Sequence, residues 1–379
     1  MKKMRKIKIV NIISRLRFGG VESVIYNYYS NMNLEQFDIY IITKKDYKDE
    51  AIIKFKEIGF KFIFVDDWEK NPVKVKKQLL RIFTENKFDI IHSHLSHTNF
   101  YFMYLAYIAK IPVRISHSHL SIKDKKICDK IKHYIYKRII SFFATDYVAC
   151  GKEAANNLYG KNKKVVIFNN AIDMEKYMFN NAIRNQYRNE LKITSNSFCV
   201  GTVGRMTYQK NQEYLIEIFE KIKNKNKNSK LIIIGNGENK EKLVLKIAEK
   251  QLQNDVIILE NRTDVAQLLN VFDVFVLPSL YEGLPVVGIE AQASGLKCFL
   301  SSNIDKSVKI CDNCFFLSIN EKPEFWSNYI LKKSKYKRQK MSDIITKSGF
   351  NIRYEGKKLE KYYLSLYDRS CNDEKNSNY

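Results

Sequence analysis

Two carboxylates separated by seven residues stand in the most distinctive segment of the sequence, PSLYEGLPVVGIE at residues 278–290. This segment directly follows an apolar run, residues 271–277, that predicts a buried strand. Pro285 suits the first turn of a helix, which places Glu282 in the preceding loop and Glu290 inside the helix. From these positions the two carboxylates can accept hydrogen bonds from hydroxyls at different parts of one polyhydroxylated ligand. A structural loop capped by a glutamate is the alternative, and it would not need the flanking Gly and Pro.

A second segment, GTVGRMTYQKN at residues 201–211, carries Arg205 and Lys210 where a strand ends and a helix begins. Arginine supplies a planar fork of donors and lysine a compact charge, and this combination can hold a diphosphate. Preorganised cations also stabilise the negative charge that grows on a leaving diphosphate, without a metal ion. The alternative for this pair is a solvated basic turn.

Five of the six histidines form a third feature, because they lie within or just after two short runs, DIIHSH and VRISHSH. They are His92, His94, His97, His117 and His119. A zinc ion is conceivable here, but we expect the members of each pair two residues apart to point to opposite faces of their strand. The sequence also lacks the H-E-x-x-H helix of many zinc enzymes. Hydrogen bonding or acid–base chemistry in a cleft is therefore favoured, with structural histidines as the alternative.

Adjacent glycines, Gly19 and Gly20, follow the first predicted strand in RFGGVE and open a helix. Glycines allow close approach of the backbone to a ligand, and free N–H groups at a helix start favour a phosphate. An ordinary glycine turn is an equal alternative. The segment is not G-x-G-x-x-G, so a dinucleotide cofactor is disfavoured. Gly235-Asn-Gly237 follows another predicted strand and is alone only a weak turn signal.

Short apolar runs alternate with longer stretches of helical period along most of the chain, and the runs predict strands buried on both faces of parallel sheets. They occupy residues 8–13, 38–43, 61–65, 89–92, 113–116, 146–149, 165–168, 198–203, 230–234, 256–259, 274–277 and 297–300. The predicted fold class is α/β, with two tandem Rossmann-like, doubly wound domains facing across a cleft. Ligands of such sheets bind at the carboxyl ends of the strands, where the unusual residues fall.

We expect the first domain at residues 1–178 and the second at 179–350. Residues 174–197 lack a strand-like run and predict the linker. A last segment, residues 351–379, is expected to cross back to the first domain. Its helical spacing over 352–368 gives an apolar face formed by Leu359, Tyr362, Tyr363 and Leu366. Residues 370–379 predict a loose polar tail.

The charge balance of the 379-residue chain is strongly basic, with 65 Lys and Arg against 41 Asp and Glu, a formal +24. Such a surplus points to polyanionic partners: nucleic acid, an anionic membrane surface or phosphorylated substrates. The seven cysteines are odd in number and scattered, and Cys311-x-x-Cys314 has no second pair to complete a zinc site, which predicts ordinary thiols. The apolar stretches are too short for a signal sequence or a membrane span, so we expect a cytosolic protein, soluble or peripheral.

The segments GGVE, RISHSH, GRMTYQKN and PSLYEGLPVVGIE occur in this order, and together they resemble the retaining glycosyltransferases of the GT-B fold, specifically glycosyltransferase family 4. The likeness covers essentially the whole chain and is nearest to bacterial enzymes of capsule, exopolysaccharide or O-antigen assembly. It implies transfer of a hexosyl unit from a nucleoside diphosphate sugar, a UDP-sugar by preference, to an acceptor hydroxyl with retention. No Asp-x-Asp motif marks a metal site, and we expect catalysis without a metal or cofactor.

The resemblance also implies roles for individual residues. Glu282 would contact hydroxyls of the donor sugar and Glu290 the ribose, with the diphosphate between Arg205 and Lys210. The whole implied donor-binding set is Gly19, Gly20, Arg205, Lys210, Arg262, Glu282, Gly283, Leu284 and Glu290. The implied catalytic set is His117, His119, Glu282, Arg205 and Lys210. The family's active-site histidine corresponds to His117 or His119, and His117 is favoured.

Two positions depart from the family pattern. In Asn169-Asn-Ala-Ile-Asp173 no glycine stands where members often have one, and we expect Asn170 to take the left-handed conformation instead. Asn261 replaces a glycine that often precedes the base-binding segment around Arg262. Neither change removes a charged ligand.

Other functions are weighed against this one. A GT-B sugar-nucleotide epimerase or phosphorylase is the nearer alternative, and it differs because only a transferase needs an acceptor hydroxyl. A nucleic-acid-binding protein is more distant: the basic runs at 221–230 and 332–340 lack a helix-turn-helix, zinc-finger or RNP pattern. We therefore expect no nucleic-acid partner.

The positive charge has a more specific candidate role in the block from Lys123 to Arg138, where seven Lys and Arg stand against two Asp. Interleaved apolar residues such as Ile131 and Ile135 make this block amphipathic, as suits an anionic membrane surface. We expect peripheral docking on the inner face of the membrane, near a polyprenyl-diphosphate-linked saccharide acceptor.

Overall fold

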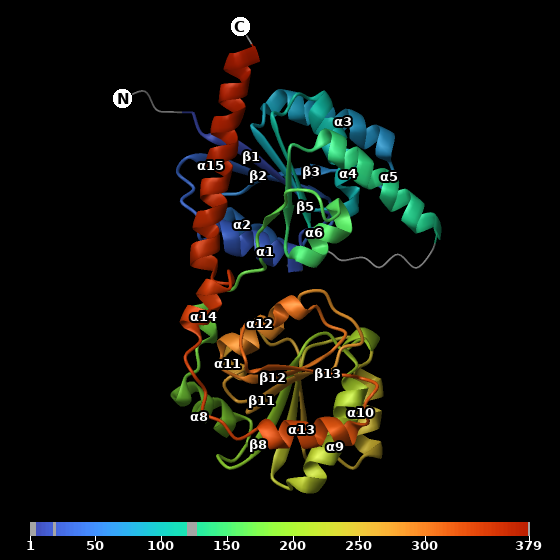
Figure 1. Cartoon of the computed structure of the whole chain (residues 1–379), viewed down its shortest axis with the longest axis vertical. Coiled ribbons are helices and arrows are strands. Elements are labelled where there is room, and N and C mark those ends of the chain that lie inside the picture. Colours follow the sequence, from blue (N-terminus) through green and yellow to red (C-terminus); the bar gives the residue numbers. More distant parts are fainter. Residues whose placement is uncertain (1–4, 18–19, 120–126, 378–379) are drawn as a thin grey trace. The chain divides into compact units, whose positions relative to one another are not determined.

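The computed structural model describes residues 5–17, 20–119 and 127–377, which form two compact units (Figure 1). The first unit contains Met1–Ala171 and Ile352–Tyr379, and the second contains Ile172–Asn351. The expected border after residue 178 thus lies seven residues beyond the observed one. The C-terminal segment groups with the first unit.

The first unit is a seven-stranded parallel sheet with helices on both faces. Its strands are β1 (Ile7–Ile12), β2 (Phe37–Lys44), β3 (Lys61–Val65), β4 (Ile90–Ser93), β5 (Val113–Ser118), β6 (Asp146–Ala149) and β7 (Val166–Ile167). Its helices are α1 (Gly20–Tyr29), α2 (Asp49–Glu57), α3 (Pro72–Asn86), α4 (Asn99–Ile108), α5 (Ile127–Phe143), α6 (Lys152–Tyr159) and α15 (Ile352–Ser377), with a 3₁₀ turn over Ser96–Thr98.

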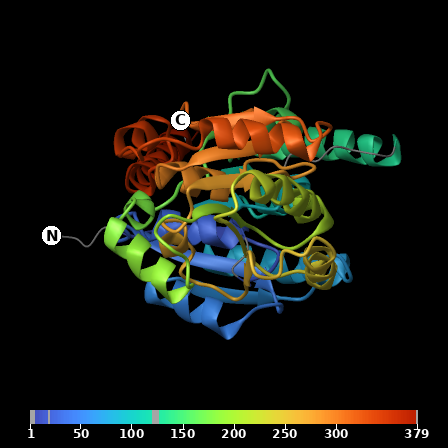
Figure 2. The same cartoon turned by 90° about the horizontal axis from the view of Figure 1, so that it is seen from below.

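The second unit repeats this plan with a six-stranded parallel sheet. Its strands are β8 (Phe198–Val203), β9 (Ser229–Ile234), β10 (Val256–Leu259), β11 (Val274–Leu277), β12 (Lys297–Ser301) and β13 (Cys314–Leu317). Its helices are α7 (Met174–Tyr177), α8 (Asn181–Glu190), α9 (Gln212–Lys225), α10 (Lys240–Glu249), α11 (Val265–Leu268), α12 (Val286–Ala293), α13 (Pro323–Lys333) and α14 (Ser342–Lys347), with 3₁₀ turns over Tyr208–Lys210 and Lys306–Val308. α13 lies beside α9 in both views (Figures 1 and 2).

The order of the strands in each sheet determines where ligand-binding loops are expected. The first sheet runs β3-β2-β1-β4-β5-β6-β7 and the second β10-β9-β8-β11-β12-β13. Each order reverses once, at the β1/β4 pair and at the β8/β11 pair. In doubly wound sheets this reversal opens a crevice outside the carboxyl ends of the strands, where ligands bind. The loops after β1, β4, β8 and β11 are therefore the places where site residues are expected.

Both faces of each sheet are buried, which explains why the strands read as continuous apolar runs. In the first unit, Ile9 and its alternate neighbours pack against α1, α2 and α15, while Val10 faces α3, α4 and α6 on the other side. In the second unit, Ile232 faces the α12 layer and Ile233 faces α9, α10 and α13. Burying aliphatic side chains of this kind contributes about 1.5–3 kcal/mol each, so these two-sided cores hold the carboxyl ends of the strands in place.

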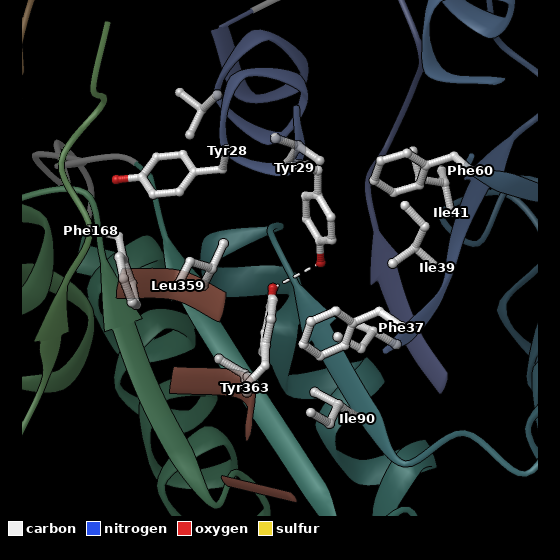
Figure 3. Close-up of a cluster of buried hydrophobic side chains, with 14 of the residues drawn as sticks. Tyr28, Tyr29, Phe37, Ile39, Ile41, Phe60, Ile90, Phe168, Leu359 and Tyr363 are labelled. Atoms are coloured by element: carbon white, nitrogen blue, oxygen red, sulfur yellow. Dashed lines mark hydrogen bonds between the residues drawn. The ribbon is translucent and has the colours of Figure 1, made fainter. Parts of the chain in front are cut away.

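The C-terminal helix completes the core of the first unit. Leu359, Tyr363 and Leu366 of α15 are buried in the core that covers one face of the first sheet, and Tyr362 packs against it (Figure 3). The predicted apolar face is therefore correct. The predicted loose tail after residue 370 is wrong, because α15 continues to Ser377.

Two further sequence-based expectations need correction. All twelve predicted strands are present, and β13 is an additional one that the apolar-run pattern did not reveal. The stretch 174–197 is not a linker, because it contains α7 and α8 and belongs to the second unit. Within α8 the buried residue is Arg188, so the helix lacks the apolar stripe from which it could have been predicted. Among the described helices, none combines the length and apolarity that a membrane span requires.

Candidate active site

The loops after β8 and β11 lie side by side because their strands are neighbours in the sheet. Gln209 donates from its side chain to the Tyr281 carbonyl at 2.9 Å, and its own carbonyl accepts from the Leu280 amide at 2.8 Å. Asn211 donates to the Pro278 carbonyl at 3.1 Å, while its backbone takes a φ of 54° just before α9. These bonds tie the predicted diphosphate segment to the predicted carboxylate segment.

Lys210 and Glu282 form an ion pair across these two loops. The Glu282 carboxylate also accepts a hydrogen bond from Ser279 at 2.8 Å. Both side chains of the pair are largely buried, with 16% of Lys210 and 10% of Glu282 exposed. Glu282 lies in the loop before α12, as predicted, while Pro285 is the residue just before the helix rather than inside it.

Arg205 lies on the same loop as Lys210 but is exposed. Within the described residues, no hydrogen bond or ion pair of its guanidinium is found. Its fork of donors is therefore available to an anionic ligand, whereas the Lys210 charge is already balanced by Glu282.

Glu290 lies on α12 and is held by another element of the second unit. Tyr177 of α7 donates a hydrogen bond to Glu290 Oε1 at 2.7 Å. Burial raises the pKa of the Glu290 carboxyl, and the Tyr177 hydrogen bond opposes that shift. A carboxylate that accepts from one such donor retains acceptor capacity for a ligand hydroxyl.

Arg262 has its guanidinium engaged by Asp264, with Nε–Oδ1 at 2.8 Å and Nη2–Oδ2 at 2.5 Å. Asp264 also accepts from Tyr187 at 2.9 Å. The guanidinium is thus occupied within its own loop. Asn261 has a φ of 54°, the left-handed conformation in which it takes the place of a glycine.

Gly235 and Gly237, which the sequence indicated only as a weak turn, explain how the loops after β8 and β9 pack. A Cβ at Gly235 would lie 2.1 Å from the Gly204 carbonyl oxygen, and one at Gly237 would lie 2.2 Å from the Met206 oxygen. Met206 donates its amide to the Asn236 carbonyl at 2.8 Å. The glycines therefore let the β9 loop support the segment that carries Arg205.

In the first unit, the histidines gather at the carboxyl ends of β4 and β5. His92 Nε2 lies 3.0 Å from His117 Nδ1, and His94 Nδ1 lies 3.0 Å from His119 Nε2. The expectation that the members of each pair diverge is wrong: the His92 and His94 rings stack at 4.2 Å and those of His117 and His119 at 3.9 Å. The physical reason is that residues two apart on a strand share a face.

These rings are kept neutral by their surroundings. Burial lowers the pKa of His92 and of His119 to about 3, and it lowers the pKa of His94 and His117 well below the usual 6.5. One nitrogen of each of His92, His94 and His117 lies within 4.8 Å of the others, a spacing that one metal ion could span. Hydrogen bonds already join His92 to Tyr363 and His117, and His94 to Asn11, so the three rings are also held without an ion.

The remaining predicted residues are placed as follows. Gly20 begins α1, where an added Cβ would meet no atom within 4 Å, and Gly19 lies outside the described residues. Gly283 is exposed and Leu284 partly buried against the second core. Asn170 does not take a positive φ, contrary to expectation, because the turn closes by an Ala171 amide to Asn169 carbonyl bond of 2.7 Å. Burial raises the pKa of the Cys314 thiol to about 12 and also that of Cys311, and both thiols are free.

Two family models match the chain, one in each unit. "Glycosyltransferase Family 4" matches residues 18–176 and "Glycosyl transferases group 1" matches residues 183–341. The chain belongs to glycosyltransferase family 4.

Its relatives include the putative glycosyltransferase EpsF of Bacillus subtilis, 26% identical, with 97% of this chain and 98% of EpsF covered. A UDP-Gal:α-D-GlcNAc-diphosphoundecaprenol α-1,3-galactosyltransferase of Escherichia coli is 29% identical, with 95% and 97% covered. The capsular polysaccharide biosynthesis glycosyltransferase CapH of Staphylococcus aureus is 25% identical, with 95% and 99% covered.

Solved structures confirm the GT-B fold of this glycosyltransferase. Anabaena HepE in complex with UDP superposes with a TM-score of 0.74 at 15% identity, covering 98% of this chain and 100% of HepE. Sucrose-phosphate synthase of Thermosynechococcus elongatus gives 0.73 at 13% identity, covering 96% and 100%.

Several contacts that support the candidate site of this glycosyltransferase were not predicted from the sequence. Tyr177 holds Glu290, Ser279 holds Glu282, and Tyr363 lies 2.6 Å from His92 Nδ1. Ser279 stands inside the recognised motif and was within reach of motif reasoning. Tyr177 and Tyr363 were not, since each comes from a distant part of the chain.

Proposed function

We propose that this glycosyltransferase moves a hexosyl unit from a nucleoside diphosphate sugar, preferably a UDP-sugar, to an acceptor hydroxyl with retention of configuration. The observation that carries the proposal is the placement of Arg205, Lys210 and Glu282 on two adjoining loops at the reversal point of the second sheet. Two cations and a carboxylate at one place suit a diphosphate joined to a hydroxyl-rich sugar.

The roles follow from the chemistry of each group. Arg205 and Lys210 hold the diphosphate and stabilise the charge that it gains on leaving. Glu282 accepts from sugar hydroxyls and Glu290 from the ribose. Backbone groups around Arg262 hold the base, with Gly283 and Leu284 beside the donor. Because two side-chain cations can balance the leaving group, we propose that the reaction needs no metal ion.

The names of relatives support the choice of substrates. The E. coli relative is named for UDP-Gal and for a diphosphoundecaprenol-linked acceptor, and HepE was solved with UDP and with UDP-glucose. CapH is named for capsular polysaccharide biosynthesis. We propose the corresponding substrates here: a UDP-sugar and a saccharide on a polyprenyl diphosphate, in cell-surface polysaccharide assembly.

A lipid-linked acceptor calls for a membrane contact, and α5 offers one. Four exposed apolar side chains of α5 fall on a single stripe, since a helix turns about 100° per residue; they are Ile131, Tyr134, Ile135 and Phe142. Lys130 and Lys137 flank this stripe on one side and Lys132 on the other. A basic-flanked apolar stripe is the pattern of a helix that lies in an anionic interface. Of the basic block, residues 123–126 lie outside the described residues. We propose that the protein docks through α5 as a peripheral protein on the cytoplasmic face of the membrane.

A thermal-shift panel of UDP-, GDP- and ADP-sugars, followed by transfer to a polyprenyl-diphosphate-linked saccharide, tests the function. We expect a UDP-sugar to raise the melting temperature of the wild type. The rise should be equal for Lys227→Ala, a control at an exposed lysine, and smaller for Arg205→Ala. NMR of the product should show the anomeric configuration of the donor. Stabilisation by no nucleotide sugar would reject the proposal, and turnover without an acceptor would favour an epimerase.

A further inference from the structure

A chain of hydrogen bonds links the C-terminal helix to the favoured active-site histidine. Tyr29 Oη lies 2.9 Å from Tyr363 Oη, as the dashed line in Figure 3 shows. Tyr363 Oη lies 2.6 Å from His92 Nδ1, and His92 Nε2 lies 3.0 Å from His117 Nδ1. At the far end Asn11 Nδ2 donates to Tyr29 Oη at 2.9 Å. All five side chains are buried in the first unit.

Each neutral imidazole carries one N–H, so the direction of one hydrogen bond fixes the next. If Tyr363 donates to His92 Nδ1, then the His92 proton is on Nε2 and is donated to His117 Nδ1. The proton of His117 must then be on Nε2. If instead His92 Nδ1–H donated to Tyr363, every bond would reverse and His117 Nε2 would carry no proton.

The first direction is the favoured one. A phenol, with a pKa near 10, is a far better proton donor than a neutral imidazole N–H, and a neutral imidazole nitrogen is a better acceptor than a phenol oxygen. Burial raises the pKa of Tyr363 well above its usual value, so its hydroxyl keeps the proton it donates. Asn11 does not set a direction, because its Nδ2 donates to Tyr29 Oη at 2.9 Å while the Tyr29 hydroxyl also lies 3.1 Å from Asn11 Oδ1 as a donor. The direction therefore rests on the Tyr363–His92 pair.

The outer end of the chain is His117 Nε2. The side chain is buried, with 3% of its surface exposed, and Nε2 has no hydrogen-bond partner among the described residues. His119 differs, because its Nε2 is engaged by His94, whose own Nε2 meets the Asn11 amide oxygen at 3.2 Å. An amide oxygen only accepts, so His94 carries its proton on Nε2 and His119 must donate to His94 Nδ1.

We propose that Tyr363 is a positioning residue: through His92 it keeps the His117 proton on Nε2, so that His117 presents a hydrogen-bond donor to the substrate rather than a base. The part that concerns substrate rests on the proposed function. The tautomer of His117 does not, since it follows from the first unit alone.

Nitrogen-15 NMR of the full-length protein labelled at histidine tests the proposal directly, with signals assigned by His117→Asn. We expect wild-type His117 to be the Nε2–H tautomer at about pH 7.5, well above the lowered histidine pKa values. Tyr363→Phe should move it wholly or partly to Nδ1–H, because His92 Nδ1 loses its donor. Tyr362→Phe, one position away on α15, should leave it unchanged.

Two results would overturn the proposal. One is a wild-type His117 that carries its proton on Nδ1, a result that does not depend on whether Tyr363→Phe folds. The other is a folded Tyr363→Phe variant in which the His117 tautomer is unchanged. A transfer assay adds the functional part. Tyr363→Phe should lower kcat about tenfold or more with little change in KM for the donor, whereas Tyr362→Phe keeps both. If wild-type His117 is the Nε2–H tautomer but the protein transfers no sugar, the role of Tyr363 in setting the tautomer is supported and the proposed function is rejected.

Discussion

Lys210 and Glu282, 72 residues apart in the chain, neutralise each other as a largely buried ion pair. A donor diphosphate that binds Lys210 as proposed must therefore share or displace Glu282 to gain the Lys210 charge. We expect Glu282→Gln to bind UDP several-fold more tightly than the wild type while it transfers sugar much more slowly. Calorimetry with UDP and a transfer assay measure the two effects, and a fall in UDP affinity would contradict this account.

Lys210→Ala removes a cation that we propose stabilises the leaving diphosphate. We expect kcat/KM to fall about 10²-fold or more, in the range seen when one preorganised charge-stabilising group is lost. Lys227→Ala, an exposed lysine of the same unit, is the matched control and should keep its rate. A near-wild-type kcat/KM for Lys210→Ala would remove this residue from the mechanism.

Tyr177→Phe tests the ribose contact. The Tyr177 hydrogen bond lowers the pKa of Glu290 against the effect of burial, so its loss should raise that pKa further. Nucleotide binding that needs the Glu290 carboxylate should then weaken at a higher pH in the variant than in the wild type. Calorimetric titrations with UDP between about pH 5 and 8 provide the measurement, and coincident pH profiles would count against a role for Glu290.

Stability of the first unit should fall as the pH drops below about 6.5, the ordinary histidine pKa. His92 and His119 have their pKa lowered to about 3 in the folded state, so the unfolded chain binds more protons between these values. Each such ring lowers the free energy of unfolding by up to about 1.4 kcal/mol per pH unit over that window. The second unit contains no histidine and serves as an internal reference.

The two tryptophans report on the units separately, because Trp68 lies in the core of the first and Trp326 in that of the second. Urea unfolding of Trp326→Phe follows the first unit, and that of Trp68→Phe follows the second. We expect the midpoint to shift down between about pH 7.5 and 5.5 far more for the first unit. Equal shifts would show that the histidines are not held neutral.

Dialysis against EDTA should leave sugar transfer intact, and the purified protein should hold no stoichiometric transition metal. His92, His94 and His117 are close enough to share an ion, so this measurement is decisive for them. Activity that EDTA abolished and Mn²⁺ or Zn²⁺ restored would overturn metal-independent catalysis.

Vesicle co-sedimentation tests α5. Binding should increase with the anionic lipid fraction and should be lost on charge reversal of Lys130, Lys132 and Lys137. The control reverses Lys221, Lys225 and Lys227 in the second unit and should bind normally. Binding that ignored lipid charge would contradict docking through this helix.

Most of the fold was predictable because both sheets are buried on two faces, which makes their strands short apolar runs. Helix α8 was not predicted because Arg188 and other polar residues line it. Asn180, whose side chain accepts from the Ala182 and Ile183 amides, is nevertheless a recognisable N-cap. Motif order placed Glu282 and Lys210 in the right loops. Their ion pair was not predictable, since it depends on β8 and β11 being neighbours. The Tyr363 contact with His92 likewise joins residues 271 positions apart.

The return of the chain to its first unit has a consequence for biosynthesis. Residues 172–351 form a contiguous unit that is synthesised in full before α15, whereas the first unit is incomplete until α15 has been made. We therefore expect the second unit to complete its fold before the first, the reverse of the usual order in which the N-terminal domain folds first. Tyr363 is synthesised last of the side chains that connect to His117, so a chain terminated before α15 would contain the whole second unit but lack the contact of Tyr363 with His92.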